Sequence, residues 1–492
     1  MEMRRTAKEN QFWYQAMPWI VAAAALFSAS SMMFRMLWFD EVLTVDLLMK
    51  LPLRRIYFAY EIPNNHIVFT LLEKIWFSII SLCTGFSYYY FRLVPMLCGA
   101  AAVFLLTRTL IRKSGLAAGI LVPGTFAASS SYAIYSTAIR GYMTSFLFIV
   151  LAMSGAEKIL KLGRRRDYLF YFLLSVLAAG TAPTNLAALT GITLYFLPRG
   201  FRSGRAGIRK LIFLAASPGF ALALFYLPIL DKFLGCIRLG EGWNSAASAI
   251  YTFYTGALFP LSGLLIFCIA GTVCIWRKIP RLRWNCVCGL LIVLMPLGAY
   301  LVMRVPPFPR VFFPLLAVWL FPLAHSLNAF FRQFRKRKTA VCAVFLLQGM
   351  FCAVFFQDRA QLAGNFLYES DGRTDDYIAP YYARPSFNPV RLLEYLREKY
   401  RTEGEFHAFA AFNSDPPSLF FAASMLDFPE GILLTDTLNR PKTLRLQDYS
   451  GPKYLICGGE DELKRMLDRF GFRAAVLEKK FGIQSLYRAT QQ

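Results

Sequence analysis

The chain has 492 residues, of which 56% are hydrophobic, and a formal net charge of +24. Soluble globular domains contain about 45–50% apolar residues even when glycine is counted, and the excess here lies in runs of roughly 18–25 residues, the length that crosses a lipid bilayer. Composition therefore excludes an ordinary soluble protein and predicts a polytopic α-helical membrane protein.

The positive charge does not indicate a nucleic-acid partner, because it is spread between the apolar runs and is not gathered in one basic domain. This distribution is the positive-inside pattern of membrane proteins. We therefore expect no nucleic acid, a chain embedded in the lipids of the plasma (inner) membrane, and five basic clusters on its cytoplasmic side. These clusters lie at residues 108–113, 158–166, 199–210, 277–283 and 332–338.

About eleven membrane spans are predicted. The basic N-terminus precedes an apolar run that is longer than the core of a signal peptide, so we interpret it as a retained first helix. With the N-terminus in the cytoplasm, an odd number of spans places all five basic clusters inside. The expected spans are 12–34, 90–111, 115–134, 142–161, 168–182, 184–198, 211–230, 250–276, 285–303, 311–330 and 339–357.

The apolar stretch 67–83 is a candidate for a further span. Counting it would move every basic cluster outside, and a span would have to bury Glu73 at its centre. We therefore expect an amphipathic helix at the membrane surface. The first outer loop then runs from about residue 35 to 89, with surface helices near 41–50 and 66–82.

The composition changes at about residue 358, where long apolar runs stop and charged residues become frequent. This divides the sequence into a transmembrane domain, residues 1–357, and a small α/β domain, residues 358–492. The odd number of spans makes the second domain extracytoplasmic. Within it, periodicity predicts helices at 388–400 and 461–470 and strands at 406–412, 453–457, 473–478 and 483–488.

The first outer loop opens with Asp40 and Glu41, directly after the first apolar run. Carboxylates near a bilayer are costly and usually functional. In one interpretation Asp40 is a general base that deprotonates an acceptor hydroxyl, and Glu41, about 100° away on a helix, supports the site. In the other, Asp40 is the N-cap of a helix that begins at Glu41. The sequence leaves both interpretations open.

Other polar residues lie in the predicted outer loops. Asn65 and His66 could bind a sugar or a phosphate headgroup, or could form a turn and helix cap with an exposed His66. Arg140 precedes Tyr142 on the side where the positive-inside bias disfavours arginine, so it could hold a lipid phosphate or snorkel to the membrane surface. With three histidines and no paired spacing, the sequence predicts no zinc site.

Further arginines add positive charge outside. Arg92 starts the second span, and Arg304 and Arg310 flank a proline-rich loop. A phosphate anchored at the outer leaflet would need such a cluster. Ordinary headgroup contact, worth about 1 kcal/mol per charge, is the alternative. The sequence has no nucleotide-type phosphate-binding motif, which argues against an ATP-driven transporter.

Five short motifs together resemble the GT-C glycosyltransferases. The branch they resemble most is family 39, which includes the protein O-mannosyltransferases and the aminoarabinose transferases of lipid A. The resemblance covers about residues 12–330 and departs from the family pattern at His66 and Val311. The motifs are Phe39-Asp40-Glu41, Asn64 to Leu72, Phe91 to Pro95, Ala138 to Tyr142 and Pro309 to Pro314.

The resemblance implies a multi-helix membrane domain with surface helices in the first loop. It also implies transfer, with inversion, of a sugar from a polyprenyl-phosphate donor in the outer leaflet to an acceptor hydroxyl. By this resemblance Asp40 is the base, and Arg140, with Arg310, neutralises the leaving phosphate. The predicted catalytic residues are Asp40 and Glu41, and the predicted substrate-binding residues are Asn65, His66, Arg92, Arg140, Tyr142 and Arg310.

The acceptor class stays open between protein, lipid and polysaccharide, and so does any requirement for a divalent cation. One alternative function is a transporter or flippase for lipid-linked sugars, although few ionisable residues lie at mid-membrane positions. The other is a non-enzymatic membrane protein of polysaccharide assembly, for which the Asp40-Glu41 pair is not needed.

Overall fold

A computed structural model describes most of the chain. The described residues are 2–30, 32–33, 37–60, 65–83, 88–239, 280–302, 309–333, 389–411, 414–426, 428–435, 449–482 and 484–490. The predicted spans at 250–276 and 339–357, and Arg304, lie outside them.

The chain divides into two compact units. The first, the helical unit, comprises residues 1–34, 51–358 and 375–378. The second, the tail unit, comprises residues 35–50, 359–374 and 379–492. The segment that carries Asp40 and Glu41 therefore clusters with the C-terminal domain, whereas the predicted division by sequence assigned it to the membrane domain.

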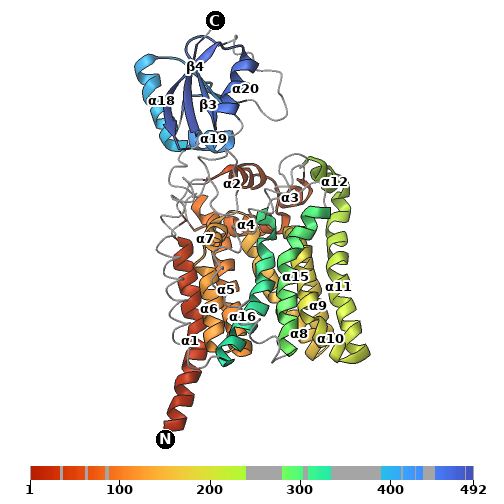
Figure 1. The fold of residues 1–492 in the computed structure, drawn as a ribbon. Coiled ribbons are helices and arrows are strands. Elements are labelled where there is room, and N and C mark those ends of the chain that lie inside the picture. Colours follow the sequence, from red (N-terminus) through yellow and green to blue (C-terminus); the bar gives the residue numbers. More distant parts are fainter. Residues whose placement is uncertain are drawn as a thin grey trace. The chain divides into compact units, whose positions relative to one another are not determined.

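The helical unit consists mainly of apolar helices that run side by side (Figure 1). Because their side chains are apolar over most of their length, their backbone groups must be satisfied within each helix, as a membrane requires. The longer helices are α1 (Glu2–Ser30), α5 (Leu93–Ser114), α8 (Tyr142–Lys161), α9 (Arg165–Thr181), α10 (Asn185–Arg202), α11 (Gly204–Tyr226), α15 (Pro280–Val302) and α16 (Leu316–Gln333).

The described residues contain five helices that are long and apolar enough to cross a membrane. These helices lie at residues 12–30, 89–114, 142–161, 204–236 and 310–332. Helices α9, α10 and α15 coincide with three further predicted spans, so the chain is a multi-pass helical membrane protein. The total of about eleven spans stays a prediction, as do the inner membrane and the cytoplasmic N-terminus.

The predicted span 115–134 is two helices, α6 (Leu116–Ala127) and α7 (Ser130–Thr137), bent by 64°. Ser129 causes the break through local hydrogen bonds of the kind that compete with a continuous helix. Its hydroxyl donates to the Phe126 carbonyl at 2.6 Å and accepts from the Tyr132 amide at 3.2 Å. The bend directs α7 into the short loop that carries Arg140.

Short helices occupy the segment between the first two predicted spans, as expected from the sequence. α2 (Phe39–Val42) continues into the π-helix η1 (Leu43–Leu48), and α3 (Leu53–Phe58) and α4 (Ile67–Ile80) follow. α4 has 14 residues and is therefore about 21 Å long, too short for a hydrocarbon core of about 30 Å.

The sequence argument against a span assumed that Glu73 would not be buried. This assumption was wrong, although its conclusion that α4 is not a span agrees with the length of the helix. The side chain of Glu73 is fully buried, and neither carboxyl oxygen has a hydrogen-bond partner among the described residues. Burial raises the pKa of Glu73 well above its ordinary value, which favours the protonated carboxyl. A neutral carboxyl can be buried where a carboxylate cannot.

The tail unit contains a five-stranded mixed sheet with strand order β2-β1-β3-β5-β4. β1 pairs in parallel with β2 and β3, whereas β5 pairs antiparallel with β3 and β4. The strands are β1 (His407–Ala410), β2 (Leu433–Thr435), β3 (Lys453–Cys457), β4 (Ala474–Phe481) and β5 (Gln484–Thr490).

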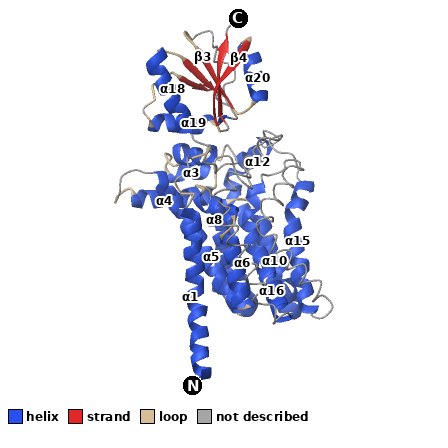
Figure 2. Cartoon of the chain, turned by 60° about the vertical axis from the view of Figure 1, so that its left-hand side comes forward, coloured by secondary structure: helices blue, strands red, loops and turns tan. Residues whose placement is uncertain are grey.

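Helices cover both faces of this sheet (Figure 2). α18 (Pro389–Glu403) and α19 (Pro416–Met425) pack on one face, against Ala408 and Ala410. α20 (Glu460–Phe470) packs on the other, against Phe409. The alternation along β1 sends successive side chains to opposite faces. The predicted helices and strands lie at these places, and α19 and β2 were not predicted.

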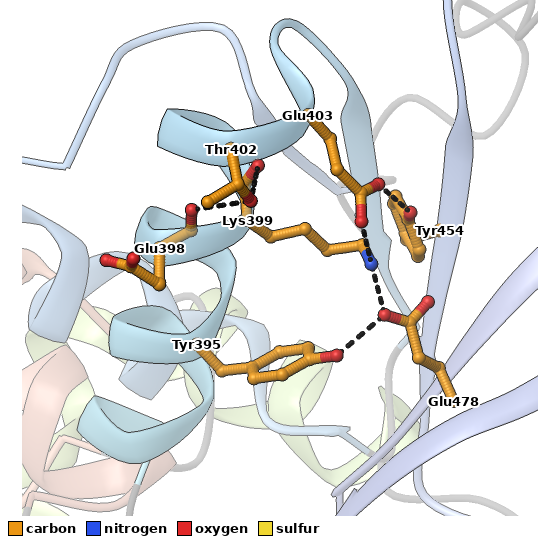
Figure 3. A network of polar contacts seen from close by, with 7 residues as sticks. All are labelled: Tyr395, Glu398, Lys399, Thr402, Glu403, Tyr454 and Glu478. Atoms are coloured by element: carbon orange, nitrogen blue, oxygen red, sulfur yellow. Dashed lines mark hydrogen bonds and ion pairs between the residues drawn. The ribbon is translucent and has the colours of Figure 1, made fainter.

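A buried lysine joins α18 to the sheet (Figure 3). Nζ of Lys399 donates to Oε1 of Glu403 at 2.8 Å and also to Glu478 on β4. The hydroxyl of Tyr395 donates to Glu478 at 2.7 Å, and that of Tyr454 on β3 donates to Glu403 at 3.3 Å. Burial acts to lower the pKa of Lys399, but these hydrogen bonds outweigh it and raise the pKa.

We predict that Lys399→Met destabilises α18 on the sheet by about 1–3 kcal/mol, because it leaves hydrogen-bonded carboxylates without their shared donor. The measurement is amide hydrogen exchange over residues 389–403 in the full-length protein. Arg401→Met is the matched control, since Arg401 and Glu398 form an exposed pair with side-chain exposures of 64% and 68%, worth about 0–1 kcal/mol. Equal loss of protection in both variants would contradict the prediction.

Candidate functional site

The acidic pair lies at the start of α2 in the tail unit. The N-cap residue is Trp38, and Oε2 of Glu41 accepts a hydrogen bond from the Trp38 amide at 3.4 Å. Glu41 thus acts as the third-residue acid of a capping arrangement. The expectation that Asp40 itself is the N-cap was wrong, because Asp40 is the second residue of the helix.

Both carboxylates are buried, and the exposed fraction is 7% for Asp40 and 0% for Glu41. After α2 the backbone widens into η1, where the Met49 amide donates to the Thr44 carbonyl at 3.0 Å. Short π-helical segments occur frequently at functional sites. The hydroxyl of Thr44 also donates to the Asp40 carbonyl at 2.9 Å, which fixes the first turn.

A residue far along the chain holds this helix start. Oδ2 of Asp415 accepts from the Phe39 amide at 3.1 Å and from the Ser418 hydroxyl at 2.8 Å, and Oδ1 accepts from the Ser418 amide at 3.3 Å. Its backbone has φ 57° and ψ 65°, a left-handed conformation that costs non-glycine residues about 1–2 kcal/mol. One carboxylate therefore serves the N-termini of both α2 and α19.

Sequence reasoning missed Asp415, although a signal was present. Asp415 is followed by two prolines, and an acidic N-cap before proline at the first helical position is a helix-start signature. The preceding turn is anchored to β5, because Nε2 of Gln484 donates to the Ser414 carbonyl at 2.7 Å. Together these bonds tie the acidic pair's helix to the C-terminal sheet.

We predict that Asp415→Ala increases amide exchange across residues 39–48 by at least about tenfold, because α2 loses the acceptor of its first N–H, a cap worth roughly 1–2 kcal/mol. Asp415→Asn should have a smaller effect, since asparagine tolerates the left-handed conformation and keeps an acceptor oxygen. Hydrogen exchange on the full-length protein measures both. Unchanged exchange at 39–48 in Asp415→Ala would show that the cap does not hold this segment.

A second group of predicted residues gathers in the helical unit. We call His66, Arg140, Tyr142 and Arg310 the arginine–histidine cluster. His66 precedes α4, Arg140 lies between α7 and α8, Tyr142 begins α8, and Arg310 lies in the 3₁₀ helix η6 (Pro309–Leu315) before α16. Each has an exposed fraction of 7% or less. Four elements thus bring two guanidinium groups, an imidazole and a phenol into the interior.

Aromatic packing orders the cluster. The rings of His66 and Tyr142 meet edge to face with centroids 5.2 Å apart, and Tyr142 meets Tyr135 of α7 at 4.9 Å. Tyr135 in turn packs on Phe313 of η6 at 4.9 Å. Edge-to-face contacts of this kind fix ring orientation. The loop after α7 and the segment around Arg310 are therefore parts of one packed body.

The imidazole of His66 is kept neutral. Burial lowers its pKa well below the ordinary value, and the charges of Arg140 and Arg310 lower the pKa further. Its Nδ1 has no hydrogen-bond partner among the described residues. The expectation of an exposed histidine was wrong. A neutral imidazole can donate or accept a hydrogen bond with a ligand. It does so without adding a third positive charge to the two guanidinium groups.

Gly141 permits the cluster to close. A Cβ at this position would lie 2.3 Å from Cγ2 of Thr181, 2.8 Å from Nδ1 of His66 and 3.2 Å from its Cβ. Such distances are far inside van der Waals contact, so only glycine fits between Arg140 and Tyr142. The backbone of the α7–α8 loop and the imidazole consequently lie directly against each other.

We predict that Gly141→Ala lowers the Tm of the purified protein by at least several degrees, because the added methyl group overpacks a rigid contact. Gly219→Ala in α11 is the matched control, since a Cβ there meets nothing within 4 Å, and alanine is the better helix former. The control should keep or raise the Tm. Equal Tm values for the two variants would contradict the close approach at Gly141.

Two predicted binding residues have structural partners. The amide of Asn65 donates to the carbonyls of Ile56 and Ala59 at 2.9 and 2.8 Å, and its oxygen accepts from Thr70 at 3.1 Å. Its polar atoms thus join α3 to α4. Arg92, fully buried, donates to the Met32 carbonyl beyond the end of α1 at 3.0 Å. These bonds give both side chains roles in joining elements of the helical unit.

No three His, Cys, Asp or Glu side chains come together as a possible metal site within the part of the chain that the structure describes. The requirement for a divalent cation therefore stays open, as it does in the sequence.

The fold matches solved structures over most of the chain. The crystal structure of ArnT from Cupriavidus metallidurans in the apo state has a TM-score of 0.50 at 10% sequence identity, and the match covers 95% of this chain and 97% of ArnT. The chain has the GT-C fold. This confirms the fold that the sequence motifs indicate.

Two other GT-C structures match with lower scores. ArnT from the same organism bound to undecaprenyl phosphate has a TM-score of 0.48 at 11% identity over 95% of this chain and 97% of that chain. The Archaeoglobus fulgidus oligosaccharyltransferase tethered with an acceptor peptide has a TM-score of 0.45 at 14% identity, covering 84% of this chain and 63% of that one. No protein-family model and no curated protein matches the sequence.

Proposed function

We propose that the protein is an inverting glycosyltransferase. It moves a sugar from a polyprenyl-phosphate donor to an acceptor hydroxyl on the extracytoplasmic side of the membrane. The observation that carries the proposal is the arginine–histidine cluster, in which the charges of Arg140 and Arg310 both act on a buried His66. The GT-C fold, first indicated by the same motifs that contain these residues, adds to the support.

The cluster suits a departing phosphate. A guanidinium group binds phosphate oxygens through two parallel hydrogen bonds and stays charged when buried. Donors that are fixed before the reaction stabilise the charge that develops on the leaving group, and they do so most strongly where water is excluded. Arg140 and Arg310 would take the phosphate, and the neutral imidazole of His66 would add a hydrogen bond without changing the charge.

Asp40 is the proposed base. The carboxylate of Glu41 reaches back to the Trp38 amide, which leaves Asp40 as the better candidate of the pair. Asp40 accepts the proton of the acceptor hydroxyl, whose oxygen attacks the anomeric carbon. The bond from that carbon to the phosphate oxygen breaks, and polyprenyl phosphate leaves with the electron pair. A single displacement of this kind inverts the anomeric configuration.

The proposed donor class is supported by the fold that the chain shares with ArnT, a protein that has been crystallised with undecaprenyl phosphate. A polyprenyl chain remains in the bilayer while its phosphate reaches the outer surface. We extend that ligand class, and no particular sugar, to this chain. Protein, lipid and polysaccharide hydroxyls are all compatible acceptors.

We predict that Asp40→Asn lowers sugar transfer by about 10²–10⁴-fold, the usual contribution of general base catalysis. The assay follows release of polyprenyl phosphate from hexose- and pentose-loaded donors in native membranes at equal protein levels. Asp46→Asn is the matched control: Asp46 lies in the same segment, is exposed and pairs with Lys50 four residues on. The control should retain the wild-type rate, and the product should have the anomeric configuration opposite to that of the donor.

Two results would contradict the proposal. Equal transfer by the wild type and Asp40→Asn would remove Asp40 as the base. Movement of a lipid-linked sugar across the bilayer, with no cleavage of its phosphate bond in any donor, would indicate the transporter function instead.

A further inference from the structure

A cavity of about 420 Å³ opens at the opposite end of the helical unit from the arginine–histidine cluster. Tyr142 of the cluster is the first residue of α8, whereas Lys161, which lines the cavity, is the last. A helix of 20 residues separates its two ends by about 30 Å. The cavity is therefore a separate place in the fold, at the end predicted to face the cytoplasm.

Basic side chains converge on this cavity from three helices. Lys113 lies in the last turn of α5, Lys161 in that of α8, and Arg199 and Arg202 in that of α10. Among the described residues that line the cavity, Glu157 is the one acidic residue. Four cations and one carboxylate give these described lining residues a net charge of +3. These side chains border a space large enough for a small ligand, and three of them, Lys161, Arg199 and Arg202, are also exposed at the surface.

Glu157 holds the cations in place. It forms ion pairs with Lys113, with Lys161 at 2.7 Å and with Arg199 at 3.7 Å. The side chains of Lys113 and Glu157 are 21% and 14% exposed, so this pair lies inside the protein. A single carboxylate cannot neutralise three bound cations, and excess positive charge in a partly buried site favours a bound anion.

Neutral polar groups complete the lining. His325 of α16 lies with Nε2 3.5 Å from the Tyr195 hydroxyl, and its Nδ1 lies 2.9 Å from the Phe321 carbonyl. Trp284 of α15 also lines the cavity, and its indole nitrogen, a donor, has no acceptor among the described residues. Phe196 and Pro198 give the cavity an apolar wall beside its charges.

We propose that this cavity binds a phosphate group, either the headgroup of an anionic phospholipid or a free phosphate anion. The convergent cations match a phosphate in charge, and the indole N–H supplies a neutral donor. The apolar wall is suited to the first carbon atoms of an acyl chain or glycerol. Basic pockets between helices on the cytoplasmic side bind lipid phosphates in this way.

The test measures binding to the purified full-length protein in nanodiscs. The first arm titrates phosphatidylglycerol against a phosphatidylcholine background and follows the Tm. The second arm adds inorganic phosphate to the protein in phosphatidylcholine alone. Stabilisation in the first arm only identifies a lipid headgroup, and equal stabilisation in both identifies a free phosphate.

The variant is Lys161→Gln with Arg199→Gln, because both side chains are about half exposed and their loss leaves the Lys113–Glu157 pair intact. The matched control is Arg165→Gln with Arg205→Gln, two exposed arginines at the same end of the helical unit that do not line the cavity. At about 1 kcal/mol per charge, the cavity variant should bind the active probe about thirtyfold more weakly, and the control should match the wild type.

Equal weakening in the cavity variant and the control would overturn the proposal, because it would reduce the effect to general surface charge. Absence of stabilisation of the wild type by either probe would overturn it as well. Both variants should keep the wild-type Tm in pure phosphatidylcholine, which separates a loss of binding from a loss of folding. Since the readout is binding, failure here would leave the proposed transfer reaction untouched.

Discussion

Buried positive charge is the constraint on which the helical unit depends. An arginine or lysine inside an apolar bundle is stable only where other groups compensate its lost hydration. At one end, Arg140 and Arg310 share their surroundings with an imidazole that burial and their own charges keep neutral. At the other, Glu157 pairs with the partly buried Lys113 and also with Lys161 and Arg199, whose side chains are about half exposed. The bundle thus has a positively charged site at each end.

The acidic segment is organised differently. Its first turn is held by Asp415, whose strained backbone is stabilised by bonds to two helix starts. The capping carboxylate of Glu41 completes the turn. The segment of the proposed base is therefore tied to the C-terminal sheet through Asp415, Ser414 and Gln484.

Sequence reasoning located most elements, because apolar runs and period-two alternation are local signals. It predicted α8, β3 and α20 nearly residue by residue. It missed the break between α6 and α7, since Ser129 lies in a run that is otherwise apolar enough for one span. It also missed α19, since the Pro416-Pro417 pair was not interpreted as a helix start. In both cases the missed feature depends on hydrogen bonds made by one side chain, Ser129 or Asp415, which the pattern of apolar residues does not reveal.

The sequence predicted which residues belong to the candidate site, but it did not predict their burial or their hydrogen-bond partners. Their positions and residue types indicated Arg140 and His66 as candidates. The neutral state of His66, however, depends on its burial and on nearby charges, including Arg310, which is 244 residues further along the chain. The roles of Asn65 and Arg92 in joining helices depend on carbonyl groups that no sequence pattern displays. The sequence likewise gives no indication that Glu73 is buried as a carboxyl group.

The division of the chain into units affects how its parts can be exchanged between related proteins in evolution. Residues 35–50 belong to the same compact unit as the C-terminal sheet, although more than 300 residues of the helical unit separate them in the sequence. A chain cut before the sheet would retain Phe39 but lose the carboxylate that binds its amide. An exchange of C-terminal domains between related proteins would preserve that bond only if the first-loop segment travelled with the sheet. The acidic pair and the Asp-Pro-Pro turn are thus expected to be inherited together, as two pieces of a single module.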